Sequence, residues 1–225
     1  MAKKDFQKED AQLENVNEVL STTGQWVEKN SNTITWCMVA VIAVVVGIVA
    51  INNYVIRPKA IEASNENAKA VNYFMQGEWE KALNGDEAEC IGFEAIADEY
   101  SLYQQGELAA LYAGICSYKL GNYEDAARFL KKFSADDLNI DPAARMMLGD
   151  AYVQLDEYDK AAKSFLSAAS SKNEIIAPIA LKKAGIVYME LENMKAANRV
   201  FVQIRDNYPA SSEASDIDKY IALTE

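Results

Sequence analysis

The chain has 225 residues, 50% of them hydrophobic, with a formal net charge of −12 and no histidine. So large an apolar share excludes wholesale disorder, and the acidic balance argues against a nucleic-acid partner. The lack of histidine removes His-based acid–base catalysis and the usual zinc sites. We therefore expect no catalytic residues, no cofactor and no metal.

Residues 1–33 form an N-terminal segment. Apolar positions recur there at spacings of three and four, which predicts one face of an amphipathic helix between Asp10 and Lys29. These positions are Leu13, Val16, Val19, Leu20, Trp26 and Val27. Such a helix could dock on another membrane protein, lie in the headgroup plane, or fail to form, and the pattern leaves all three open.

The following stretch, residues 34–56, contains no charged residue. At about 1.5 Å per residue, a helix of this length crosses a hydrocarbon core of about 30 Å. Trp36 and Tyr54 suit the headgroup level, and Arg57 lies just outside. We predict one transmembrane helix; the alternative is a very hydrophobic buried helix of a soluble protein.

This span begins too far along the chain for a cleaved secretory signal, and the preceding segment is mixed in charge. An uncleaved signal anchor fits better. Basic residues lie on both sides of the span and orient it only weakly. We place the N-terminus in the cytoplasm, because the large acidic part is the natural translocated domain.

Residues 57–209 are helical in pattern and contain a repeat. Gly114, Gly149 and Gly185 recur at intervals of 35 and 36 residues. Each is followed by an aromatic residue, a turn, another large apolar residue, an alanine and a further large apolar residue. This order resembles the tetratricopeptide repeat, a helix–turn–helix unit of about 34 residues. We expect the glycines where the two helices cross closely, opposite the alanines Ala126, Ala161 and Ala197.

A degenerate unit precedes these three, and a cap follows them. We predict a helix from about Pro58 to Gln76, a turn at Gly77, and an interrupted second helix that ends near Tyr100. Residues 210–225 are predicted to form a C-terminal capping helix that places Ile217, Tyr220 and Ile221 against the last repeat. The predicted fold is therefore all-α: one transmembrane helix followed by an α-solenoid of about four units.

The two cysteines of this part, Cys90 and Cys116, lie among apolar residues. Buried thiols are the simpler interpretation, and a disulfide would require Cα atoms closer than about 7 Å. The acidic run between Asp136 and Asp141 lacks the glycine and the distal glutamate of a calcium loop. We interpret it and the other acidic clusters as solvated surface and helix starts.

Stacked repeats of this kind curve, and the first helix of each unit lines the concave side. The side chains predicted to line this groove are Leu111, Ile115, Tyr118, Met146, Val153, Lys182, Ile186 and Met189. Some members of the repeat family grip a C-terminal carboxylate with asparagines, but Ile115, Asp150 and Ile186 stand at those positions here. The groove is therefore predicted to be apolar and to hold a partner helix or extended segment, unless the array curls tightly and fills it.

The whole architecture resembles the YfgM family, in which a short tail and one anchor precede a repeat domain. The resemblance extends to Ala68–Tyr73 and to Leu108–Tyr112 before Gly114, while the N-terminal segment is longer than expected. It implies an ancillary subunit of the bacterial Sec translocon in the inner membrane, with a periplasmic repeat domain. The implied partners are Sec translocon subunits, a membrane-anchored periplasmic chaperone of the prolyl-isomerase type, and secretory or membrane protein clients.

Three functions follow, from different classes. The first is a membrane-anchored scaffold at the translocon, and the second is a scaffold of another envelope assembly or secretion machine. The third is an enzyme, for which the sequence offers no phosphate-binding loop, no Ser–His–Asp set and no Cys-x-x-Cys. Copurifying proteins would distinguish the first two, and a pocket of converging polar groups would favour the third.

Overall fold

The computed structural model describes residues 26, 29–86, 89–171 and 173–225. The chain divides into two compact units, Met1–Pro58 and Lys59–Glu225. Regular structure in the described ranges is helical, as predicted, and their one β-type pairing is an isolated bridge between Asp86 and Cys90. The predicted amphipathic helix of residues 10–29 lies almost entirely outside the described residues.

In the first unit, helix α2 (Ser31–Ile51) is followed by a π-helical turn, η1 (Asn52–Ile56). Helix α2 is long and apolar enough to cross a membrane, and its most apolar window is 0% buried. Pro58 explains the wide turn, because a proline removes one helical N–H and its ring clashes with the carbonyl four residues earlier. The wider π-helical turn therefore lies just before the proline.

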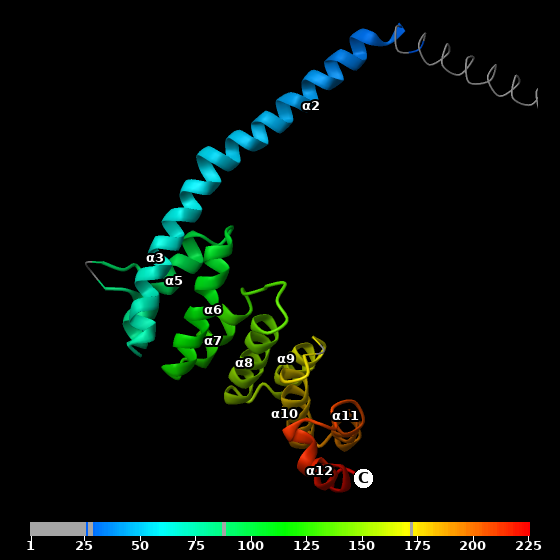
Figure 1. Cartoon of the computed structure of the whole chain (residues 1–225). Helices are drawn as coiled ribbons and strands as arrows, with labels where there is room; N and C mark the ends of the chain where they lie inside the picture. Colours follow the sequence, from blue (N-terminus) through cyan, green and yellow to red (C-terminus); the bar gives the residue numbers. More distant parts are fainter. Residues whose placement is uncertain (1–25, 27–28, 87–88, 172) are drawn as a thin grey trace, which may run out of the picture. The chain divides into compact units, whose positions relative to one another are not determined.

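The second unit is a series of helix pairs, seen as successive hairpins from green to orange in Figure 1. We call the first helix of each pair the A helix and the second the B helix. The A helices are α3 (Arg57–Met75), α6 (Gln104–Lys119), α8 (Ile140–Gln154) and α10 (Ile176–Glu190). The B helices are α4 (Trp79–Asn84) with α5 (Gly92–Glu99), α7 (Tyr123–Leu130), α9 (Tyr158–Ala169) and α11 (Met194–Asn207).

In the last three repeats the A helix crosses its B helix at a glycine that has no room for a larger side chain. A Cβ atom added to Gly149 would lie 2.5 Å from the Phe165 ring, and one added to Gly185 would lie 2.2 Å from the Phe201 ring. At Gly114 the obstructing side chain is Leu130, at 2.6 Å. The predicted role of these glycines is confirmed. The alanines opposite them, Ala126, Ala161 and Ala197, are each 0% exposed.

The A helices also end alike. The residue seven positions after the crossing residue has a left-handed backbone in every repeat. These residues are Gly77, Gly121, Asp156 and Glu192, with φ of 76°, 81°, 56° and 55°. The next residue donates its amide back to the helix, as Asn122 does to the Ser117 carbonyl at 2.9 Å. This C-terminal motif turns the chain so that the B helix can fold back on the A helix.

The first repeat departs from the others in its B helix. Helix α4 stops at Asn84, and a loop closed by Gly85 and Gly92 intervenes before α5. A Cβ atom added to Gly92 would lie 2.4 Å from the Gly85 nitrogen. The two backbone segments therefore lie very close together at the base of the loop. The loop is held from within by Asp86, which accepts the Cys90 amide and the Tyr73 hydroxyl.

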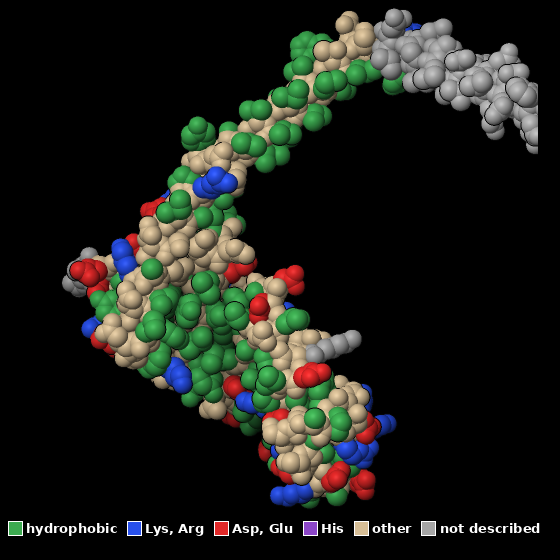
Figure 2. All heavy atoms as spheres, viewed as in Figure 1, with side chains coloured by type: hydrophobic (Ala, Val, Ile, Leu, Met, Phe, Trp, Pro, Cys, Tyr) green, Lys and Arg blue, Asp and Glu red, His purple; other side chains and the backbone are tan. Residues whose placement is uncertain are grey.

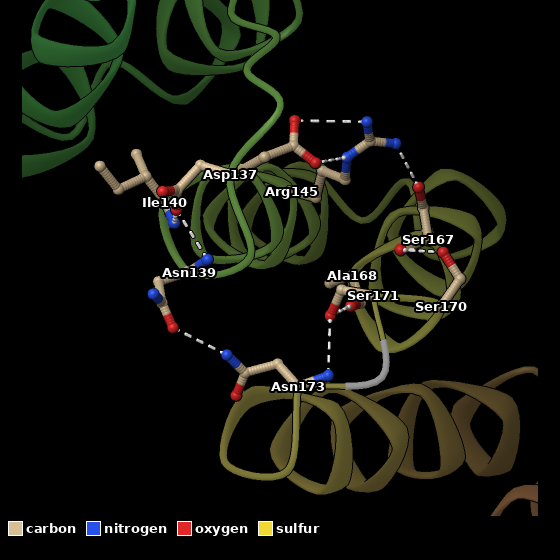
Figure 3. A network of polar contacts seen from close by, with 10 residues as sticks. Asp137, Asn139, Ile140, Arg145, Ser167, Ala168, Ser170, Ser171 and Asn173 are labelled. Atoms are coloured by element: carbon tan, nitrogen blue, oxygen red, sulfur yellow. Dashed lines mark hydrogen bonds and ion pairs between the residues drawn. The ribbon is translucent and has the colours of Figure 1, made fainter.

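Polar contacts join neighbouring repeats at intervals of about one repeat length. Arg128 on α7 donates to Glu94 on α5 at 3.0 Å, and one turn later Lys132 donates to Asp98 at 2.6 Å. The amide of Asn173, before α10, donates to the side chain of Asn139, before α8, at 2.9 Å (Figure 3). Because these contacts repeat with the period of the array, they fix the register of each repeat on the one before.

The last repeat is closed by η2 (Ser212–Asp216) and α12 (Ile217–Leu223). Ile217 and Ile221 are 1% and 6% exposed and share a core cluster with Phe201. The ring of Tyr220 lies 5.2 Å from that of Phe201. The short helix thus covers the apolar side of α11 that a further repeat would otherwise bury.

Candidate protein-interaction surface

Two of the predicted groove residues, Leu111 and Ile115, lie on helix α6. Leu111 is only 9% exposed and packs in a cluster with Leu130 and Ala144, against which Ile115 is half-buried. Leu111 is therefore chiefly a packing residue between the second and third repeats. It offers a partner little surface, because the A helix of the next repeat lies against it.

Four further predicted residues, Tyr118, Met146, Val153 and Met189, are half-buried at the boundaries between repeats. Met146 contacts the clusters of both the third and the fourth repeat, and Tyr118 meets the ring of Tyr123 edge-on at 5.3 Å. Burial raises the pKa of the Tyr118 hydroxyl. These side chains each keep one edge accessible.

The remaining two predicted residues, Lys182 and Ile186, lie on α10 and differ sharply. Lys182 is engaged within the chain: its Nζ donates to Asp216 at 2.6 Å and lies 5.1 Å from the Tyr220 ring. Ile186, by contrast, is 41% exposed. The structure thus leaves Ile186 as the most accessible apolar member of the predicted set and ties Lys182 to the cap.

The structure also exposes apolar side chains of the A helices that were not among the predicted groove residues. Leu108, one turn before Leu111 on α6, is 41% exposed, and Met75 at the end of α3 is 80% exposed. Figure 2 shows hydrophobic side chains gathered around α6 and α7. The signal that could have found Leu108 is its repeat position, six residues before the crossing glycine.

An aromatic cluster joins the first repeat to the second. The Phe74 ring on α3 meets Tyr112 on α6 at 4.9 Å and Trp79 on α4 at 5.1 Å, both edge-on. Tyr112 in turn stacks on Phe93 at 5.0 Å. Such contacts stabilise beyond the area that they bury, so the two repeats are held together by specific ring geometry.

The position where a carboxylate clamp would need asparagine is occupied in the third repeat by Asp150. Both of its carboxylate oxygens accept from Lys183 of the next A helix, at 2.6 and 2.8 Å. An ionised aspartate only accepts hydrogen bonds, so Asp150 cannot donate to a partner's terminal carboxylate as an asparagine amide would. The groove therefore favours apolar contacts over recognition of a chain terminus.

Little in the described part of the chain suggests catalysis. No group of three or more carboxylate or cysteine side chains there is placed to hold a metal ion. Cys90 and Cys116 are free and buried, and burial raises the pKa of the Cys116 thiol to about 12. A thiol so far from ionisation is a poor nucleophile. Asp137, in the acidic run before α8, instead accepts the amides of Asn139 and Ile140 (Figure 3), which lowers the pKa of its carboxyl.

Comparison with known proteins supports the repeat assignment. No curated protein sequence matches the chain. A family model described as a tetratricopeptide repeat-like domain matches residues 24–216, which covers the apolar helix, the four repeats and η2. Domains of this kind are protein-interaction modules. The chain therefore belongs to the tetratricopeptide repeat-like family.

Proposed function

We propose that the protein is a membrane-anchored interaction scaffold at the bacterial Sec translocon, as in the YfgM family. Its single span crosses the inner membrane with the N-terminus in the cytoplasm and the repeat domain in the periplasm. The repeat groove binds a membrane-anchored chaperone of the prolyl-isomerase type or secretory and membrane proteins as they emerge. The family match supports this arrangement, since it spans the apolar helix and the repeats together.

The observation that carries the proposal is the exposed apolar surface of α2. Val41, Ile48 and Trp36 are 62%, 61% and 74% exposed, and the helix has no buried residue. In water such a surface is costly, at about 25 cal/mol per Å² of apolar area. In a bilayer the same surface is solvated by hydrocarbon, and the helix satisfies its own backbone groups.

The groove supplies the second part of the argument. Leu108 and Ile186 are each 41% exposed, and Ile115, Tyr118 and Val153 are half-buried on the A helices. An apolar strip on stacked helices is suited to a partner's amphipathic helix or extended segment. Recognition of this kind tolerates varied sequences, which fits a protein that meets many emerging clients.

The first experiment is affinity purification of the full chain from gently solubilised bacterial membranes, followed by identification of the copurifying proteins. We expect translocon subunits and a membrane-anchored chaperone. Recovery of a different envelope assembly or secretion complex would instead favour the second scaffold function. Absence of translocon subunits would count against the proposal.

The second experiment tests the groove with a matched pair of substitutions. Ile186→Asp on α10 removes an apolar contact at a side chain that is 41% exposed, so the fold should tolerate it. Met194→Asp is the control, because Met194 has the same exposure but lies at the start of the B helix α11. We expect partner recovery to fall for the first variant and to persist for the second. Equal recovery would place the binding surface elsewhere.

A further inference from the structure

A second surface lies at the end of the fourth repeat, and none of the predicted groove residues lines it. It is a pocket of about 850 Å³ where α9 and α11 end and α10 begins. Its apolar lining includes Ile175, Ile179, Tyr208 and Pro209. Ile175 is 75% exposed, which is unusual for an isoleucine beside a formed core.

The side of the pocket formed by α10 is held in place by Asn173. Its side-chain amide donates to the Leu138 carbonyl and to the Asn139 side chain, each at 2.9 Å (Figure 3). Its side-chain oxygen accepts the amides of Ile175 and Ile176, each at 2.9 Å. The first turn of α10 is therefore anchored to the preceding repeat, and Ile175 is presented on a fixed backbone.

The opposite side is held by the segment that follows α11. Pro209 cannot continue the helix, and the Ser211 hydroxyl caps the Ala214 amide at 3.3 Å as η2 begins. The Ser211 hydroxyl also donates to the Tyr208 carbonyl at 2.8 Å. The hydrogen bonds that hold the two sides do not cross the pocket, and the space between the sides stays open.

The pocket is electronegative. Among the described residues, its only charged lining residues are Glu174 and Glu213, and neither of them is ion-paired. The C-terminal ends of α9 and α11 also face it, and helix C-termini carry partial negative charge. At the start of α10, Asn173 already accepts two of the first amides, so these N–H groups are not free to bind an anion.

We propose that this pocket binds an extended segment of another protein in which a lysine or arginine stands beside aliphatic or aromatic residues. The cation pairs with Glu174 and Glu213, while its neighbours cover Ile175 and Ile179. A pocket lined by both carboxylates and apolar side chains selects this combination. A purely apolar segment would leave the carboxylates unpaired, and an acidic segment would be repelled.

The test uses the full chain in nanodiscs of phosphatidylcholine, a lipid without net charge that does not attract a cationic probe. The probe is the fluorescein-labelled peptide Gly-Ala-Leu-Lys-Phe-Leu-Lys-Ala-Gly, and binding is followed by fluorescence anisotropy. A matched peptide carries glutamate in place of both lysines. We expect the lysine peptide to bind, the glutamate peptide not to bind, and binding of the first to weaken as salt is raised.

Two variants and one control locate the site. Glu174→Lys with Glu213→Lys should weaken binding by about tenfold or more, which corresponds to about 1.4 kcal/mol. Glu80→Lys with Glu124→Lys makes the same change in net charge on other repeats and should leave binding within about twofold. Ile175→Ser changes no charge and should weaken binding by about threefold through lost apolar contact. Circular dichroism checks that each variant is folded.

The proposal is overturned if both charge-reversal pairs weaken binding equally, because bulk charge would then explain it. It is also overturned if Ile175→Ser binds like the unchanged protein. Self-association that disappears with the Glu174 and Glu213 reversals would assign the pocket to a second copy instead. None of these results depends on the translocon, so failure here leaves the proposed function standing.

Discussion

The first repeat and the three that follow face the same packing problem with different residues. In the later repeats a large side chain sixteen positions after the crossing residue presses on it, and the crossing residue is glycine. In the first repeat the residue at that position is Asp86, which bonds to Tyr73, and the crossing residue is Ala70, fully buried. The size allowed on an A helix is therefore decided by what the B helix places against it.

Because of this difference, the first repeat is less regular than the three that follow. With its large side chain displaced to Phe93, the first repeat needs an inserted loop and an additional aromatic cluster to fill the same space. The later repeats reach a close-packed crossing with one glycine and one ring or leucine. Regular repeats are thus more sensitive to single changes at the crossing, and the predictions below test that view.

The largest expected effect is loss of the ring at a regular crossing. Phe201 is 0% exposed, and Phe201→Ala should lower the free energy of unfolding by about 4 kcal/mol through lost transfer energy and a residual cavity. Urea unfolding of the full chain in detergent, followed by circular dichroism, measures this. A loss well under 1 kcal/mol would show that the ring does not hold the fourth repeat together.

The next effect comes from adding a methyl group at the crossing. Gly185→Ala places a Cβ 2.2 Å from the Phe201 ring, so overpacking of about 3 kcal/mol should outweigh the gain of about 1 kcal/mol in helix propensity. In the Phe201→Ala background the clash is gone, and the same substitution should be neutral or stabilising.

The first repeat provides the contrast. Ala70→Gly should cost only about 1 kcal/mol, mainly from helix propensity, because the residue sixteen positions later is Asp86, which bonds to Tyr73, and not a large apolar side chain. The free energies of unfolding of Ala70→Gly and Gly185→Ala are measured by the same urea unfolding.

Additive effects of Gly185→Ala and Phe201→Ala on the free energy of unfolding would contradict the direct contact between these two residues.

A smaller effect is expected at the ends of the A helices. Gly121 has a left-handed backbone with no atom near an added Cβ, so Gly121→Ala should cost about 1 kcal/mol from backbone strain alone. Glu192 has the same conformation without being glycine, and Glu192→Gly should gain about as much. Thermal unfolding of the two variants should therefore shift in opposite directions. Shifts of the same sign would disprove the shared geometry.

The smallest effect at neutral pH concerns the cap. The hydrogen bond from Lys182 holds the pKa of the Asp216 carboxyl below its usual 3.8. Because the folded pKa is the lower one, this contribution to stability is present above pH 3.8 and is lost as the pH falls through the folded pKa. Asp216→Asn, or Lys182→Met, should flatten the acid limb of the unfolding free energy measured in a pH series. An unchanged limb would show that the pair adds nothing.

The sequence alone was sufficient to predict the helical class, the apolar span, the repeat period and the glycines at which the helices cross. These are properties of one helix face, and the spacing of residues along a helix fixes which of them share a face. The sequence also predicted a turn in every repeat, although glycine marks the left-handed residue only at Gly77 and Gly121. Asp156 and Glu192 adopt the same conformation without a signal, because the surrounding repeat imposes it.

Only the tertiary structure determines how much of each predicted side chain is accessible to a partner. Leu111 and Ile186 occupy the first helices of the second and fourth repeats and were predicted alike, yet one is 9% and the other 41% exposed. The charged residues behave likewise: Lys182 is engaged by a cap residue 34 positions away, whereas Glu174 and Glu213 border an open pocket. A periodic pattern determines which way a side chain points from its own helix. What it meets there depends on the neighbouring repeat, which packs against it from a distant part of the chain.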